Sequence, residues 1–252
     1  MNNKLPAAIL FDMGGVLFQV HPREAGYNIV ARHVDQLLKR SSGMSPGLLQ
    51  IEADLKAASR AYGNWKNAQS RRAHCREITH REFWEDFVAA DWTEPARSAV
   101  VAHASPLCLF LEQNIMERPP TEGALELLQR LAQMGIRTGC ISNALSGACS
   151  RLLMERYGFE ELLGIQIYSD EIGVRKPNPE IFEWATHSLN VAPQDCWYVG
   201  DKFDRDVLAG RRAGIGRVVL MLSEETNTGA QVTADPDHII RTPLELLDLL
   251  NR

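Results

Sequence analysis

The amino-acid sequence predicts an α/β fold in which a doubly wound parallel sheet carries an inserted, all-helical region. Two observations indicate this fold class. Short apolar runs alternate with amphipathic helical patterns from about residue 118 onward, and residues 7–12 form another such run. Residues 19–117 lie between them, are helix-patterned and show few strand signals. We therefore expect residues 1–18 and 118–252 to share one core, and residues 19–117 to fold as a helical insert.

The composition is that of an ordinary globular protein and argues against several functional classes. The 252 residues are 45% hydrophobic and 23% charged, which suffices for a large core. The net charge of −5 favours neither nucleic acid nor anionic membranes as partners. Five scattered cysteines without a C-x-x-C pair indicate reduced thiols, and no apolar stretch approaches the ~20 residues of a membrane span. We expect a cytoplasmic protein that binds neither nucleic acid nor membranes; the sequence leaves its oligomeric state open.

The first half of the sequence contains one strand and several helices. Residues 7–12 read as a buried strand that ends at Asp12 and meets a glycine-rich turn. Apolar residues recur every three to four positions over residues 29–38, which predicts an amphipathic helix. A second such pattern over residues 83–87 follows Thr79, a residue type that often caps a helix N-terminus.

The second half alternates strands and helices as a doubly wound sheet requires. Apolar runs predict strands at 136–142, 164–169, 196–200 and 217–221. Periodicity and end signals predict helices at 121–134, 203–213 and about 243–250, and a further helix that is opened by Asn178 and Pro179. The first strand, at residues 7–12, is apolar up to Asp12, as expected when helices cover both faces of a sheet.

Polar residues gather at one edge of the predicted sheet. Asp12, Ser142 and Asp201 each stand at the end of a predicted strand, and sheets of this kind bind ligands at the carboxyl ends of their strands. Lys176 and Asp206 add an ammonium group and a further carboxylate. Mg²⁺ takes oxygen ligands, a lysine ammonium binds phosphate oxygens, and a carboxylate can attack phosphorus. These residues therefore predict a site for a dication and a phosphoryl group.

Four motifs occur in order along the predicted core. They are F-D-M-G-G-V-L at residues 11–17, Ser142-Asn143 at a strand end, K-P-N-P-E-I-F at residues 176–182, and Gly200-Asp201 followed by Asp206. Together they resemble the motifs of the haloacid dehalogenase-like (HAD) hydrolase superfamily, over residues 5–18 and about 118–250. The resemblance implies a Rossmann-like catalytic core, and it identifies the insert with the helical cap that many members place directly after the first motif.

The resemblance also implies a role for each matched residue. Asp12 would be the nucleophile and form an aspartyl-phosphate. The implied Mg²⁺ ligands are Asp12, the backbone carbonyl of Gly14, Asp201 and Asp206, the last of which would orient either water on the ion or Lys176. The implied phosphoryl-binding residues are Ser142, Asn143 and Lys176. The implied activity is Mg²⁺-dependent hydrolysis of a small phosphorylated metabolite.

The first motif departs from the family pattern at Gly14, where phosphatases of the family usually carry a second aspartate. That aspartate protonates the leaving oxygen and then activates water, and such help is typically worth ~10²–10⁴-fold in rate. Three interpretations follow. The chain is a phosphatase whose acid is replaced by water, a cap residue or the substrate; or a different hydrolase, such as a 2-haloacid dehalogenase or a phosphonate-cleaving enzyme; or a catalytically impaired protein that uses the site for binding or regulation. We favour the first because Asp201 and Asp206 are retained.

Overall fold

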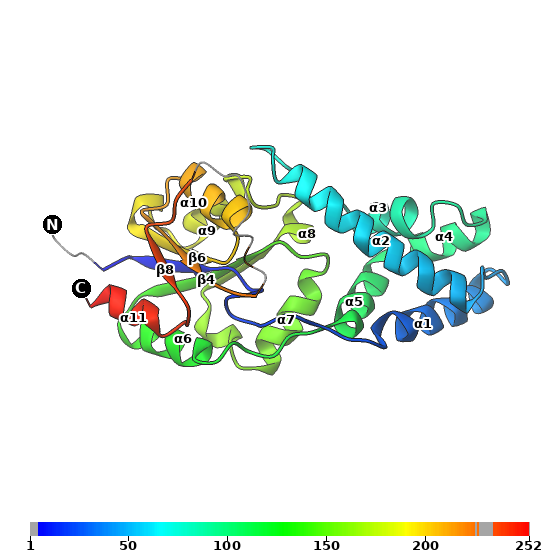
Figure 1. Ribbon diagram of the computed structural model, residues 1–252, viewed down its shortest axis with the longest axis horizontal. Coiled ribbons are helices and arrows are strands. Elements are labelled where there is room, and N and C mark those ends of the chain that lie inside the picture. Colours follow the sequence, from blue (N-terminus) through cyan, green and yellow to red (C-terminus); the bar gives the residue numbers. More distant parts are fainter. Residues whose placement is uncertain (1–4, 225, 227–233, 252) are drawn as a thin grey trace. The chain divides into compact units, whose positions relative to one another are not determined.

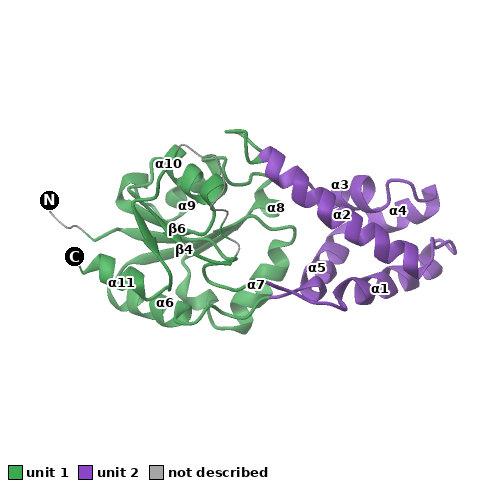
Figure 2. Cartoon of the chain, in the orientation of Figure 1, with its two compact units in different colours: residues 1–20, 70–76, 118–252 green, residues 21–69, 77–117 purple. Residues whose placement is uncertain are grey.

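A computed structural model of the chain describes residues 5–224, 226 and 234–251, which form two compact units (Figure 2). Unit 1 comprises residues 1–20, 70–76 and 118–252, and unit 2 comprises residues 21–69 and 77–117. Residues 1–4, 225, 227–233 and 252, which the predicted core includes, lie outside the described residues. Residues 70–76, which we expected in the helical insert, group with unit 1.

Unit 1 contains the predicted parallel sheet. Its strands are β1 (Ala8–Phe11), β4 (Arg137–Ser142), β5 (Ile165–Tyr168), β6 (Cys196–Gly200), β7 (Arg217–Met221) and β8 (His238–Ile240). They run parallel in the order β5-β4-β1-β6-β7-β8 (Figure 1). After β1, the chain adds β4 and then β5 on one side of β1. It then adds β6 on the other side of β1. The strand order thus reverses between β1 and β6, and ligands of open α/β sheets bind at the carboxyl ends of the strands beside such a reversal.

Helices cover both faces of this sheet, which explains why the central strand β1 is apolar and fully buried. Along β1, Ile9 and Phe11 belong to one core layer, and Ala8 and Leu10 belong to the other, because side chains alternate along a strand. The first layer is packed by α6 (Ala124–Gln133), α7 (Gly147–Arg156) and α11 (Glu245–Leu250), and the second by α9 (Glu180–Ser188) and α10 (Leu208–Arg212). Figure 1 shows α6 and α11 on one side of the sheet, and α9 and α10 on the other.

Helix ends in unit 1 follow local sequence signals. The side-chain Oδ1 of Asn178 accepts a hydrogen bond from the backbone N–H of Glu180 at 3.1 Å, so Asn178 opens α9 as predicted. Gly135 has a φ of +72° and follows the end of α6, again as predicted. At its other end α6 begins at Ala124 rather than at residue 121, because Gly123 adopts a left-handed φ of +79° just before it.

Unit 2 is helical, as the sequence predicts. It contains α1 (Gly26–Ser41), α2 (Leu48–Gln69), α3 (His80–Glu82), the π-helix η1 (Phe83–Val88), α4 (Glu94–Ala102) and α5 (Ala104–Ile115). Where the chain enters and leaves the unit, β2 (His21–Pro22) pairs with the antiparallel strand β3 (Met116–Glu117). Thr79 caps α3 as predicted: its hydroxyl accepts the backbone N–H of Glu82 at 3.1 Å, and the Glu82 carboxylate accepts the backbone N–H of Thr79 at 2.7 Å.

Several elements of unit 1 differ from the sequence prediction, and the longest of them is α7, where no helix was predicted. The strand β8 at the sheet edge was not predicted, and the predicted helix 203–213 divides into a π-helix, η4 (Phe203–Val207), and α10. Short helices η2 (Glu160–Leu162), α8 (Ser169–Ile172) and η3 (Pro193–Asp195) complete the unit. All five cysteines are buried, and none of them forms a disulfide. None of the helices in the described ranges has the length and apolar character that crossing a membrane requires.

Candidate active site

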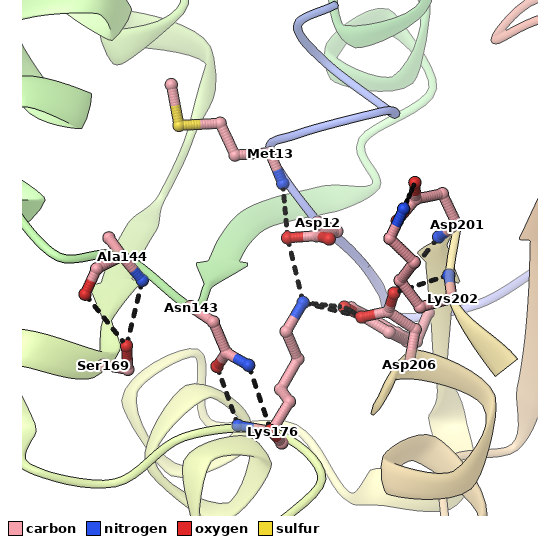
Figure 3. A network of polar contacts seen from close by, with 10 residues as sticks. Asp12, Met13, Asn143, Ala144, Ser169, Lys176, Asp201, Lys202 and Asp206 are labelled. Atoms are coloured by element: carbon pink, nitrogen blue, oxygen red, sulfur yellow. Dashed lines mark hydrogen bonds and ion pairs between the residues drawn. The ribbon is translucent and has the colours of Figure 1, made fainter. Parts of the chain in front are cut away.

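Asp12 directly follows β1 at the carboxyl edge of the sheet. Its Oδ1 accepts the backbone N–H of Met13 at 2.8 Å and lies 2.9 Å from the Nζ of Lys176 (Figure 3). The Asp12 side chain is 13% exposed and that of Lys176 is 2% exposed. Two donors therefore hold Oδ1, whereas no described residue donates a hydrogen bond to Oδ2, which leaves that oxygen available to a ligand.

Lys176 is the centre of a buried polar network with Asp206 and Tyr198. Its Nζ lies 2.6 Å from the Oδ1 of Asp206 and donates to the Tyr198 hydroxyl at 2.7 Å, and that hydroxyl donates to the same Oδ1 at 2.6 Å. The Oδ2 of Asp206 accepts the backbone N–H groups of Asp201, at 3.2 Å, and of Lys202, at 2.9 Å. These four bonds use the hydrogen-bonding capacity of both oxygens. The geometry thus gives Asp206 the task of holding Lys176 and the turn after β6.

Asp201 follows β6 at the same edge of the sheet and is 1% exposed. Its Oδ2 accepts the Ser223 hydroxyl at 2.7 Å and lies 3.0 Å from the Nζ of Lys202. The backbone of Gly15 approaches the same oxygen: its φ is +76°, and a Cβ added there would lie 2.3 Å from Oδ2. Only glycine fits this position. Three groups therefore enclose Oδ2, and Oδ1 is the oxygen that Asp201 can offer to a ligand.

Three carboxylates at this edge are close enough to share a metal ion. Asp12, Asp201 and Asp206 each provide an oxygen that lies within 4.8 Å of the other two, and the described residues hold no other such group of three. A set of carboxylate oxygens suits a hard dication such as Mg²⁺, which keeps several of its waters. Asp12 and Asp201 are the better ligands, because each retains an oxygen without a donor from the described chain.

The crowding of carboxylates shifts their protonation. Burial, together with the charges of Asp206 and Asp201, raises the pKa of Asp12 to about 7, although Lys176 acts in the opposite direction. Burial and Asp206 also raise the pKa of Asp201. Burial disfavours the charge on Lys176, but Asp12 and Asp206 outweigh it and raise the pKa of that ammonium group. Without a cation, the site thus carries more negative charge than its single buried lysine balances, and a dication would relieve this excess.

The Asn143 side chain holds the backbone of Lys176 in place. Its Oδ1 accepts the backbone N–H of Lys176 at 2.8 Å, and its Nδ2 donates to the Lys176 carbonyl at 3.0 Å (Figure 3). These two bonds fix the backbone that carries Lys176, and substrate binding by Asn143 stays a prediction. A planar amide with one donor end and one acceptor end is suited to gripping a peptide group in this way.

Ser142 and Gly14, the remaining predicted site residues, lie at the end of β4 and on the loop that leaves β1. Ser142 is the last residue of β4 and is 7% exposed, and no hydrogen bond joins its hydroxyl to another described residue. The φ of Gly14 lies outside the left-handed region, and a Cβ added there would contact the Val20 Cγ2 at 3.4 Å, an ordinary distance. The backbone therefore does not require glycine at position 14.

Residues 70–76 support the loop that carries Lys176. The Cys75 thiol donates to the backbone carbonyl of Arg175 at 3.2 Å, and the Asn178 side chain donates to the carbonyl of Cys75 at 3.4 Å. Arg76 also forms an antiparallel bridge with Val174. The flanks of Lys176 are thus fixed by a segment about 100 residues earlier in the chain.

Sequence reasoning missed Tyr198, Lys202 and Ser223. Signals for two of them were present. Tyr198 is a buried tyrosine in a strand that leads to the acidic cluster, and a buried tyrosine hydroxyl usually has a hydrogen-bond partner. Ser223 lies just beyond β7, which neighbours β6, so the end of β7 belongs to the same edge. For Lys202 the sequence offered only its place beside Asp201.

The sequence pattern of the haloacid dehalogenase-like hydrolase family matches residues 6–214. This chain belongs to that family. Among the relatives of this HAD-like hydrolase is a glyceraldehyde 3-phosphate phosphatase from Methanopyrus kandleri, 32% identical over 154 residues, which are 61% of this chain and 63% of the relative. The chain thus spans less than two thirds of that relative's length.

Two further proteins match this HAD-like hydrolase over nearly its whole length. An N-acetylmuramic acid 6-phosphate phosphatase from Pseudomonas aeruginosa is 23% identical over 97% of this chain and 95% of the relative. The crystal structure of a 2-haloacid dehalogenase from Pseudomonas syringae aligns with a TM-score of 0.64 and 18% identity, over 99% of both chains. At this identity the structural match shows a shared fold.

Proposed function

We propose that this HAD-like hydrolase cleaves phosphoric monoesters of small metabolites, with Asp12 as the nucleophile and Mg²⁺ as the cofactor. The observation that carries the proposal is the Asp12 carboxylate beside the reversal of strand order, with Oδ1 held by Lys176 and no described donor on Oδ2. Two of the relatives, from M. kandleri and P. aeruginosa, are named as phosphatases, which supports this reaction class.

The chain's own residues would supply the nucleophile and two groups that bind the phosphoryl oxygens. The Oδ2 of Asp12 attacks the phosphorus atom, the bond to the leaving oxygen breaks, and an aspartyl-phosphate forms on Asp12. Water then cleaves the new bond, which releases inorganic phosphate and restores the carboxylate. Lys176 offsets the charge of the reacting groups, and the Ser142 hydroxyl would donate to a phosphoryl oxygen.

The metal would be held by Asp12, Asp201 and the backbone carbonyl of Gly14. Asp206 would contribute by positioning Lys176 rather than as a ligand, since its oxygens already accept four hydrogen bonds. A bound Mg²⁺ supplies positive charge that offsets the negative charge of the phosphoryl group. We further propose that the helical residues 19–117 serve as the cap that selects the substrate.

Gly14 provides no acid for the leaving oxygen, so its proton would come from water or from the substrate. Substrates with good leaving groups, such as acyl or aryl phosphates, suffer least from this loss. Gly14→Asp is expected to raise the rate for substrates with poor leaving groups, because the backbone at position 14 is not left-handed and an added Cβ would make only an ordinary 3.4 Å contact with the Val20 Cγ2.

Phosphate release from a panel of small phosphate esters and acyl phosphates tests the proposal. With Mg²⁺ we expect turnover, and we expect EDTA to abolish it until Mg²⁺ is restored. Asp12→Asn removes the nucleophile and should abolish release, whereas Asp204→Asn, an acid outside the three-carboxylate group, should retain it. The proposal is wrong if no member of the panel releases phosphate. Halide release from a 2-haloacid without added metal would instead identify a dehalogenase.

A further inference from the structure

The loop that leaves β4 is held by a buried serine that the proposed reaction does not use. The backbone N–H of Ala144 donates to the Ser169 hydroxyl at 2.9 Å, and that hydroxyl donates to the Ala144 carbonyl at 3.3 Å (Figure 3). Ser169 is the first residue of α8 and is fully buried. A hydroxyl can both donate and accept, so one side chain holds both polar groups of a single backbone residue. Ser169 therefore fixes the backbone two residues beyond Ser142.

This contact extends the pairing of two parallel strands beyond their ends. Ser142 is the last residue of β4, and its register partner is Tyr168, the last residue of β5. After Tyr168 the chain turns into α8, where the Ser169 carbonyl accepts the backbone N–H of Gly173 at 2.9 Å. That carbonyl is thus used within α8, and the Ser169 side chain supplies the bonds to the loop after β4.

Asn143 holds the same loop from another direction. Its side chain bonds to the backbone N–H and carbonyl of Lys176 at 2.8 and 3.0 Å. Residues 143 and 144 are therefore each tied to a different segment of unit 1. No hydrogen bond joins the hydroxyl of Ser142, directly before them, to another described residue. The position of that hydroxyl therefore depends on the backbone that these two ties fix.

We propose that Ser169 is a positioning residue for phosphoryl binding and acts through the Ser142 hydroxyl. This inference rests on the proposed function, in which Ser142 donates to a phosphoryl oxygen. A hydrogen bond weakens steeply when its donor and acceptor move out of line, so a small shift of the Ser142 backbone costs affinity. Ser169 keeps that backbone in the conformation from which the hydroxyl donates, and it touches neither the substrate nor the reacting atoms.

A double-mutant cycle on the full chain tests the inference, with the affinity for inorganic phosphate measured by calorimetry in the presence of Mg²⁺. Ser142→Ala removes the donor and should weaken phosphate binding about tenfold or more, as expected for a hydrogen bond to a charged group. Ser169→Ala misplaces the donor and should weaken binding by a smaller factor, about threefold to tenfold. The double variant should bind no more weakly than Ser142→Ala alone, because without that hydroxyl nothing remains for Ser169 to position.

Two further variants separate positioning from general stability. Thr186→Val removes a buried hydroxyl that donates to the Phe182 carbonyl at 3.0 Å within α9, so it loses a comparable bond without touching the loop after β4. It should bind phosphate as the wild type does. Ser169→Cys keeps a weak donor and a weak acceptor at the same position. It serves in place of Ser169→Ala, with the same expected lack of additivity with Ser142→Ala, if Ser169→Ala does not give a folded circular dichroism spectrum.

The outcomes distinguish this inference from the proposed function. If Ser169→Ala binds phosphate as the wild type does, or if its effect adds in full to that of Ser142→Ala, the inference is wrong and the phosphoryl-binding role of Ser142 stands. If Thr186→Val weakens binding as much as Ser169→Ala, the effect belongs to stability and the positioning role is overturned. If Ser142→Ala binds phosphate as the wild type does, or if the wild type binds none, both the inference and the proposed role of Ser142 fail.

Discussion

At the scale of single residues, the competition between burial and charge decides how the site behaves. Asp12 and Asp206 share one buried ammonium group, that of Lys176, at 2.9 and 2.6 Å. The charge and hydrogen bond of Lys176, together with the Tyr198 hydroxyl, hold the pKa of the Asp206 carboxyl below its ordinary value against the effect of burial. Asp12 has less support, and its pKa rises. Asp12, the proposed nucleophile, is therefore the carboxylate for which a proton and a bound dication would compete.

Magnesium affinity is expected to depend on pH through Asp12. Because burial raises the pKa of Asp12 to about 7, the metal-free site is protonated below that pH, and a proton must leave before a dication binds. Mg²⁺ affinity should thus rise up to about pH 7 and level off above it. Without metal, the raised pKa also means that the free energy of unfolding falls as pH increases from 3.8 toward 7. The carboxyl ¹³C shift of Asp12, followed by NMR with and without Mg²⁺, checks both; a midpoint near 4 without metal would contradict them.

Tyr198→Phe should weaken the buried network. The substitution removes the bonds of the Tyr198 hydroxyl to Lys176 and Asp206, and hydrogen bonds to charged groups are worth about 1.5–3 kcal/mol. We expect the free energy of unfolding, measured by urea denaturation, to fall by at least about 1.5 kcal/mol. Tyr168→Phe is the matched control, because it loses one neutral bond to Gln166 and should cost only about 0.5–1.5 kcal/mol. Equal losses in the two variants would show that the charged network adds nothing.

At the scale of elements, capping residues determine where helices begin, including the short helix α3 that leads into the π-helix η1. The three-residue helix α3 runs directly into the π-helix η1, whose Phe83 and Trp84 side chains are fully buried in unit 2. A π-helix is rarely stable on its own, so its entry must be fixed by its neighbours. The reciprocal bonds between Thr79 and Glu82 provide this fixation at the N-terminal side.

Thr79→Ala is expected to destabilise unit 2 by about 1 kcal/mol, because the variant loses the side-chain cap of α3. Thr93 occupies the same position before α4 but makes no side-chain cap bond. Thr93→Ala should therefore change the free energy of unfolding much less. Thermal or urea unfolding of the two variants checks the difference, and an equally large effect of Thr93→Ala would rule out the capping bond as the cause.

Elements with strong local signals could be predicted from the sequence, and elements fixed by distant contacts could not. The strand β6 matches its prediction because an apolar run ends at Gly200 and Asp201. The edge strand β8 has only three residues, of which Ile239 is exposed, so it lacks the pattern of a buried strand. Helical periodicity also cannot separate a π-turn from an α-turn, which is why η4 was missed.

The same distinction applies to the candidate site. Strand ends and motif order were enough to place Asp12, Lys176 and Asp201 at one edge of the sheet. The sequence could not show that the Asn143 amide is used on the Lys176 backbone, because that contact depends on how two loops approach each other. The sequence also could not show which aspartate keeps a carboxylate oxygen without a hydrogen-bond donor, since the donors come from three separate segments of the chain.

At the scale of the whole molecule, unit 1 is assembled from three stretches of chain. The stretches on either side of the long insertion meet, because the backbone N–H of Gln19 donates to the Pro119 carbonyl at 2.9 Å. The carboxylates of the site are likewise far apart in sequence, at positions 12 and 201. An unfolded chain cannot bring them together, so a dication would bind only the folded protein.

Mg²⁺ should therefore raise the melting temperature of the wild-type protein. Ligand binding to the folded state alone stabilises by about 2.7 kcal/mol when the ligand exceeds its Kd 100-fold. Asp201→Asn should lose most of this gain. Asp204→Asn should keep it, because Asp204 lies outside the three-carboxylate group. Thermal scans with and without Mg²⁺ make the comparison, and an equal gain in Asp201→Asn would place the ion elsewhere.

The contribution of residues 70–76 to unit 1 limits how this protein can be recombined with its relatives. A chimaera that exchanged residues 21–117 as one block would import a foreign sequence beneath Arg175 and Asn178, where Cys75 now makes its two bonds. The loop that carries Lys176 would then lack the two hydrogen bonds of Cys75, even though every motif residue was native. A chimaera that exchanged residues 21–69 and 77–117 separately would keep these hydrogen bonds. Graft designs should therefore leave residues 70–76 native.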